Sequence, residues 1–176
     1  MISNKLRIAI MSEDEVTTDI PEHADLNTAF PQTNWDTRAR GLGATLTRPA
    51  STAAEENILC YNADTYRGES IFIHEFAHSI HSLGLKFSDS SFESKLTSAY
   101  NNAVNTGLWQ NTYAISNQQE YWAEGVQSWF NANLESATAN GIHNHVNTRQ
   151  ELLVHDESLY NLIAQVFPTD WRYECP

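Results

Sequence analysis

The segment FIHEFAHSIHSLG, from Phe72 to Gly84, places three histidines and one glutamate inside an otherwise apolar stretch. Its pattern is that of a buried helix, and the sequence predicts one from about Glu69 to Leu83, with Gly84 as the C-terminal stop. Titratable side chains are costly to bury unless they have partners. This segment therefore constrains the fold strongly, because its polar groups must meet partners inside the protein.

Within the segment, His74-Glu75-Phe76-Ala77-His78 forms an H-E-x-x-H motif. Residues i and i+4 lie on the same face of a helix, so His74 and His78 can bind one metal ion through one ring nitrogen each. Zinc is the expected metal, because imidazole suits it and a catalytic site keeps one position open for water. Glu75 would lie beside the metal, where it could take a proton from the bound water. The alternative is a surface helix with incidental histidines.

A catalytic zinc needs a third protein ligand. In the metzincin pattern this ligand is a histidine six residues after the second histidine of the motif. A glycine lies midway, three residues after that second histidine. Here His81 occupies the position of the glycine, and Gly84 occupies that of the histidine. Metzincins also have a methionine downstream, whereas Met1 and Met11 both lie upstream of the motif. The metzincin pattern therefore fails, and we expect His81 to be packed or to lie beside the ligands.

The other common third ligand is a glutamate from a later helix, and NQQEYWAEGVQSWF offers two candidates. Glu120 and Glu124 share one face of this predicted helix. An apolar stripe occupies another face, formed by Trp122, Val126, Trp129 and Phe130. A helix buried along that stripe would carry the carboxylates into the interior, where zinc and its histidines could partner them. The alternative is two solvated glutamates on an amphipathic helix.

The residues YAISNQQEYWAE, from Tyr113 to Glu124, resemble the end of the zinc protease domain of the lethal-factor-like gluzincins. In that family a tyrosine precedes the ligand glutamate by seven residues, and an aromatic pair and then Ala-Glu follow the glutamate. HEFAH is also similar to the family's form of the H-E-x-x-H motif. The resemblance covers about residues 71–130, at the level of motifs.

This resemblance implies a role for each matching residue. It assigns Zn²⁺ to three ligands, His74, His78 and Glu120. Glu75 would be the general base and would later pass the proton to the leaving amine. Tyr113 would donate a hydrogen bond to the oxyanion, and Glu124 would accept one from a ligand imidazole and fix its tautomer.

The implied activity is that of a zinc metallopeptidase, an endopeptidase that hydrolyses peptide bonds of peptide or protein substrates. The competing interpretation is a zincin-fold binding module without turnover. Loss of Glu75 or Tyr113 would favour that interpretation, and both residues are present.

The implied fold is α+β, a single zincin-like metallopeptidase domain over residues 1–176. A small mixed sheet would lie over the active-site helix, and the C-terminal half would be helical. Strands are predicted at Lys5–Met11, Ala44–Pro49 and Asn57–Tyr61. Further helices are predicted at Ser91–Gly107, Asn117–Leu134 and Asp156–Phe167. Residues 12–43 are predicted to be an ordered loop with a short helix, and Gly41–Pro49 is the candidate edge strand for a substrate backbone.

The charge balance limits the partners that the protein can have. Ten Lys and Arg stand against 22 Asp and Glu, a formal net charge of −12. This balance argues against nucleic acid or an anionic membrane surface as a partner, and it mildly favours cationic substrates. No apolar run approaches the roughly 20 residues of a membrane span. We expect a monomer.

The two cysteines lie at Cys60 and, next to the last residue, at Cys175. A disulfide between them would tie down the terminal segment. The alternative is two buried free thiols in a cytosolic protein. The disulfide, together with only three lysines, favours a secreted, extracellular protein, although the first residues show no signal-peptide pattern.

A His-x-His pair, His143 and His145, lies in a predicted loop. Such a pair could bind a second metal ion. Most pairs of this kind in loops are solvated or form local hydrogen bonds, and we expect the same here.

Overall fold

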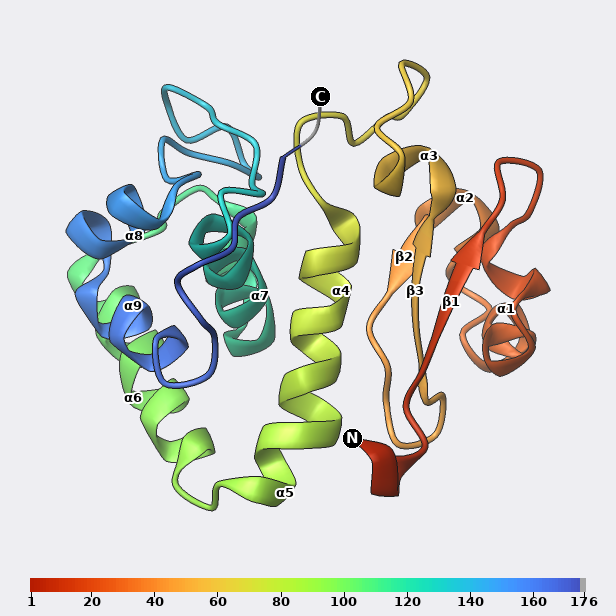
Figure 1. Cartoon of the computed structure of the whole chain (residues 1–176), viewed down its shortest axis with the longest axis horizontal. Helices are drawn as coiled ribbons and strands as arrows, with labels where there is room; N and C mark the ends of the chain where they lie inside the picture. The colour runs from red at the N-terminus through yellow and green to blue at the C-terminus, as the bar shows by residue number, and fades with distance from the viewer. Residues whose placement is uncertain (175–176) are drawn as a thin grey trace.

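The computed structural model describes residues 1–174 (Figure 1). Its N-terminal part contains a mixed sheet of three strands: β1 (Arg7–Met11), β2 (Gly41–Leu42) and β3 (Ala50–Ala54). The central strand, β3, is parallel to β1, with Arg7 opposite Ala50. It is antiparallel to β2, with Gly41 opposite Ala53. β2 is therefore an edge strand of the sheet.

Short helical turns surround the strands and occupy five segments: Ile2–Asn4, Thr17–Asp19, Pro21–His23, α1 (Leu26–Ala29) and α2 (Trp35–Arg38). The connection between β1 and β2 is ordered, as predicted. Asp36 holds part of it together, because its carboxylate accepts hydrogen bonds from the Thr18 N–H and from the Asn27 side chain, both at 2.9 Å.

The predicted strand at the N-terminus is confirmed as β1, but the other two strand predictions are wrong. Ala44–Pro49 forms a bend at residues 46–48 without strand structure, and the strand follows it as β3. The sequence of β3 is ASTAA, and all five residues are buried. Small residues let the sheet approach a helix closely, yet alanine is depleted in strands, so the pattern did not indicate one. Asn57–Tyr61 contains the end of α3 (Glu55–Ile58) and a turn.

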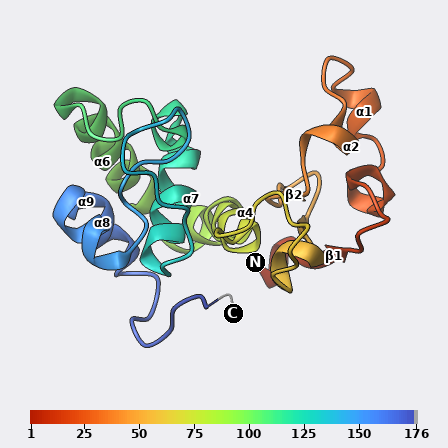
Figure 2. The ribbon, with the colours of Figure 1, turned by 90° about the horizontal axis from the view of Figure 1, so that it is seen from above.

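The helix predicted from the histidine-rich segment is α4 (Ile71–Ile80), and it lies between the sheet and the helices of the C-terminal half (Figures 1 and 2). Ser70 is its N-cap and accepts a hydrogen bond from the Ile73 N–H. The helical path continues through a π-helical turn (His81–Leu85) into α5 (Lys86–Ser88). The prediction that Gly84 ends the helix is therefore wrong, because Gly84 does not adopt the left-handed conformation of a terminating glycine.

The C-terminal half is helical, as expected. It contains a 3₁₀ turn (Tyr113–Ser116) and four α-helices: α6 (Phe92–Thr106), α7 (Gln118–Trp129), α8 (Arg149–His155) and α9 (Glu157–Ile163). Gly107 ends α6 with φ of 76°, as predicted. Asn117 caps α7, where its side chain accepts hydrogen bonds from two backbone N–H groups. α7 and α9 end earlier than predicted, and α8 was not predicted.

α7 is the central helix of the main core. All residues from Tyr121 to Trp129 are buried, and Trp122 and Trp129 are inaccessible to solvent. The Trp122 indole N–H donates to the Ala77 carbonyl of α4 at 2.9 Å. This bond fixes α7 against the H-E-x-x-H turn. No helix within residues 1–174 is both long and apolar enough to cross a membrane.

Candidate metal centre

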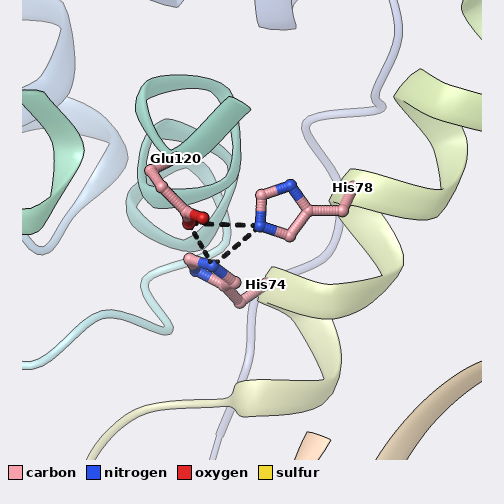
Figure 3. A group of neighbouring side chains, drawn as sticks. All are labelled: His74, His78 and Glu120. Carbon is pink, nitrogen blue, oxygen red and sulfur yellow. Dashed lines mark hydrogen bonds and ion pairs between the residues drawn. The ribbon is translucent and has the colours of Figure 1, made fainter. Parts of the chain in front are cut away.

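Two helices that are far apart in the sequence bring three predicted ligands together. His74 and His78 extend from α4, and Glu120 extends from the first turn of α7 (Figure 3). The two Nε2 atoms lie 3.0 Å apart. Glu120 Oε2 lies 3.0 Å from His74 Nε2 and 3.2 Å from His78 Nε2. Among residues 1–174, no other group of three His, Cys, Asp or Glu side chains converges in this way.

The donor set fits a divalent zinc ion. Ligand atoms about 2.0–2.1 Å from a tetrahedral zinc are separated by about 3.3 Å, close to the three separations here. Two imidazole nitrogens and one carboxylate oxygen are also a known ligand set for catalytic zinc. Nitrogen lone pairs as close as those of His74 and His78 repel each other unless a cation or a proton lies between them. The side chains are therefore positioned for a positive charge at their centre.

The electrostatics of the metal-free site lead to the same conclusion. Burial opposes a charge on His74, but Glu120, Glu75 and Glu124 outweigh this effect and raise the pKa of His74 to about 10. Burial also opposes a charge on Glu120, yet the two histidines hold its pKa well below the ordinary value. In the absence of metal, a proton on His74 thus supplies the positive charge that the carboxylates require.

His74 is oriented by a residue that sequence reasoning missed. Its Nδ1 donates to Gln127 Oε1 at 2.8 Å, which leaves Nε2 free to bind a metal. Glu124, predicted for this role, lies farther away, with Oε1 3.5 Å from His74 Nδ1. Its other oxygen accepts from Asn133 Nδ2 at 2.9 Å. Gln127 follows Glu120 by two helical turns and therefore lies on the same face of α7. This spacing could have indicated from the sequence that Gln127 lies near the ligands.

A cleft of about 690 Å³ opens onto the three ligands. Glu75 lines it, and so do residues 41–45. Tyr113 lines it as well, and its ring is inclined by 27° to that of His74 at a centroid distance of 6.3 Å. Burial, together with the nearby carboxylate of Glu120, raises the pKa of Tyr113 to about 12, so its hydroxyl stays protonated at neutral pH.

The other predicted histidines are placed differently. His81 lines the cleft but is buried, and its Nε2 pairs with Glu93, so it is a packed residue as expected. His143 is buried at the cleft wall. His145 is exposed, and its ring faces that of His155. Within the described residues, His143 and His145 therefore do not belong to a second group of converging metal ligands.

The predicted disulfide involves Cys175, which lies outside the described residues. Its predicted partner, Cys60, adopts a left-handed conformation with φ of 58°. The Tyr173 hydroxyl lies 3.4 Å from Cys60 Sγ, so the described end of the chain reaches this cysteine. The Cys60–Cys175 bond stays a prediction.

No protein-family model matches this chain, and no curated protein or solved structure is significantly similar to it. Any functional assignment therefore depends on the chemistry of the site itself.

Proposed function

We propose that this protein is a zinc-dependent peptidase of the gluzincin type. The observation that carries the proposal is the convergence of His74, His78 and Glu120 at a cleft that Glu75 also lines. The resemblance to lethal-factor-like gluzincins supports the same ligands and the same base.

The chemistry would be divided among a few side chains. Zinc held by the three ligands would supply Lewis acidity to the reaction. Glu75 would accept a proton from the attacking water and deliver it to the leaving amine. Tyr113, whose hydroxyl is protonated at neutral pH, would donate a hydrogen bond to the oxyanion of the tetrahedral intermediate.

The edge of the sheet would bind the substrate backbone. β2 is an edge strand, and residues 41–45 line the cleft beside the ligands. An extended peptide can add to such an edge through main-chain hydrogen bonds, which are independent of sequence. This arrangement suits a peptide or protein substrate. Of the predicted edge strand Gly41–Pro49, only Gly41–Leu42 forms a strand, β2.

The test combines metal analysis with hydrolysis of a mixed peptide library. The wild type is expected to hold about one zinc per chain, and His78→Ala should hold almost none. His145→Ala, which changes an exposed histidine outside the site, is the matched control and should retain the metal. Glu75→Gln should keep its zinc and lose hydrolysis by about 10²-fold or more.

Three results would contradict the proposal. Zinc retained in full by His78→Ala would exclude the ligand assignment. Turnover near the wild-type level in Glu75→Gln would exclude this residue as the base. Zinc bound by the wild type without hydrolysis of any library peptide would favour the zincin-fold binding module instead.

A further inference from the structure

The cleft extends beyond the metal ligands toward the N-terminal end of α4. Glu69, just before the helix, and His143, in the loop between α7 and α8, line this end together with Tyr66 and Ile142. We call these four residues the Glu69 pocket. None of them takes part in the proposed hydrolytic chemistry.

Glu69 is a buried carboxylate with weak partners. Its side chain is 11% exposed. Its nearest polar neighbours are Gln127 Nε2 at 3.5 Å and His143 Nε2 at 3.8 Å, both longer than an ordinary hydrogen bond. No lysine or arginine within residues 1–174 forms an ion pair with it. Burial, together with the negative charge of Glu124, raises the pKa of Glu69 to about 7.

His143 provides a second, independent observation. It is 8% exposed, and within the described part of the chain its Nδ1 has no hydrogen-bond partner. Its Nε2 faces the Glu69 carboxylate, which favours the tautomer with the proton on Nε2. Burial lowers the pKa of His143, so the ring is neutral and Nδ1 is an unsatisfied acceptor. An unsatisfied buried acceptor is costly, so a donor from a ligand would be stabilising.

The cation at the opposite end of the cleft already has a carboxylate partner. Lys86 lines that end, and its ammonium lies 3.6 Å from Glu93. The Glu69 pocket instead presents a carboxylate and an imidazole acceptor, and Glu124 lines the same cleft. A group with several N–H donors and a positive charge complements this set.

We propose that the Glu69 pocket binds a cationic group of the substrate, an ammonium or a guanidinium. This inference rests on the proposed peptidase function. The cation could belong to a lysine or arginine side chain near the scissile bond or to a free α-amino group. The two sources share the same chemistry, and the experiment separates them.

The test measures binding rather than hydrolysis. The probes are a series of alanine-based decapeptides, each with a single lysine at a different position. Each has a neutral twin, a control peptide in which norleucine replaces that lysine. Every peptide is made with a free and with an acetylated amino end. Dissociation constants are measured on zinc-loaded protein carrying Glu75→Gln, so that no peptide is cleaved.

We expect at least one lysine peptide, or the peptides with a free amino end, to bind about 10- to 100-fold more tightly than the neutral twin. Adding Glu69→Gln should remove this preference and leave the neutral twin bound as before. Glu135→Gln is the matched control, because it also removes one negative charge but lies on the exposed surface. It should leave the preference unchanged. Glu69→Gln should fold, since it replaces a weakly paired buried carboxylate by a neutral isostere.

The outcomes are distinguishable. Equal binding of cationic and neutral peptides, or no binding of either, would overturn the pocket assignment. Equal weakening of both by Glu69→Gln would also overturn it, and would show that Glu69 acts through Gln127 on His74. A cationic preference in a wild-type protein that cleaves no peptide would reject the proposed hydrolysis while supporting the pocket.

Discussion

At the scale of single residues, His74 uses both of its ring nitrogens. Nδ1 donates to Gln127, and Nε2 points to the centre of the three ligands. The surrounding carboxylates raise the pKa of this imidazole far above that of a free histidine. A metal ion bound at the proposed site would therefore compete with a proton for His74 Nε2.

Zinc binding at pH 8 is expected to release about one proton. With a pKa of about 10, His74 is protonated at this pH, and a metal ligand must be neutral. A histidine with an ordinary pKa would release only about 0.03 protons. Because the proton must leave, the apparent zinc affinity should rise about tenfold per pH unit until the pH approaches 10.

Calorimetry of zinc binding in two buffers with different heats of ionisation measures the number of protons released. His145→Ala should give the same number as the wild type. Release of less than about 0.2 protons would contradict the coupling of His74 to its carboxylates.

The role proposed for Tyr113 is to stabilise the transition state and not the fold, so Tyr113→Phe should leave zinc content and melting temperature unchanged. Its loss should lower kcat by about 10²–10³-fold with little effect on KM, because the oxyanion exists only in the transition state. Tyr121→Phe is the matched control. The Tyr121 hydroxyl is buried and donates to Asp156 at 2.7 Å, so its removal should cost about 1–3 kcal/mol of stability and leave specific activity unchanged.

Kinetics and a thermal melt on both variants check this prediction. A less stable Tyr113→Phe protein with full specific activity would show a structural role for Tyr113. If neither the kinetics nor the melting temperature of Tyr113→Phe differed from those of the wild type, Tyr113 would have no part in the proposed chemistry.

At the scale of elements, the approach of the edge strand to α4 defines one wall of the cleft. Ser79 Oγ accepts from the Ala44 N–H at 2.8 Å, and Ser82 Oγ donates to the Ala44 carbonyl at 2.7 Å. Gly43 lies between these bonds and β2. A Cβ atom there would lie 2.6 Å from His78 Cβ and 3.2 Å from the Glu75 carbonyl oxygen. The absence of a side chain at Gly43 therefore permits the close contact.

Gly43→Ala should weaken both the fold and the site. Neither His78 Cβ nor the helix backbone can swing away, so α4 or the strand must shift. Overpacking of this kind costs about 1–3 kcal/mol. We expect a lower melting temperature and weaker zinc binding, since His78 is one of the proposed ligands.

Gly84→Ala is the control for this prediction, because it adds a methyl group to the same helical path. Its Cβ would meet only the side chain of Met1, at 3.2 Å, which can move aside. Thermal melts and zinc titrations compare the two variants. Equal behaviour of both would contradict the proposed role of the Gly43 contact.

At the scale of the whole molecule, the C-terminal segment links the helical half to the region near the sheet. The Tyr173 N–H donates to the Phe130 carbonyl at 2.7 Å, and the Tyr173 hydroxyl contacts Cys60. Arg149 holds the preceding residues through the carbonyls of Thr169 and Trp171. The segment thus runs from the end of α7 to the loop after α3.

The predicted Cys60–Cys175 disulfide would link the C-terminal segment covalently to the loop after α3. Thiol titration of the unreduced, unfolded protein should find no free thiol. Because the bond would close a loop of more than about 100 residues, its removal could cost up to roughly 4–5 kcal/mol in the chain-entropy model. Cys175→Ser should therefore melt at a lower temperature, and reductant should have no further effect on this variant. Two titratable thiols would reject the bond and weaken the proposal of a secreted protein.

The sequence by itself determined what depends on local geometry. The spacing of His74 and His78 placed both on one helix face, because the period of the helix is the same wherever it occurs. Gly107 and Asn117 marked the ends of helices through the backbone conformations and hydrogen bonds that they favour. The strand before residue 12 followed from its β-branched residues. The prediction that Glu120 is the third ligand came from helical pattern and resemblance together.

Only the tertiary structure decided which side chains meet across elements. Gln127, and not Glu124, forms the short hydrogen bond to His74 Nδ1, at 2.8 Å against 3.5 Å for Glu124. Packing of α7 against α4 sets this difference in distance. Likewise, β3 consists of small residues whose strand conformation depends on burial against its neighbours. The meeting of Glu69 and His143, 74 positions apart in the chain, is also a result of packing, because no periodic pattern connects residues at such a distance.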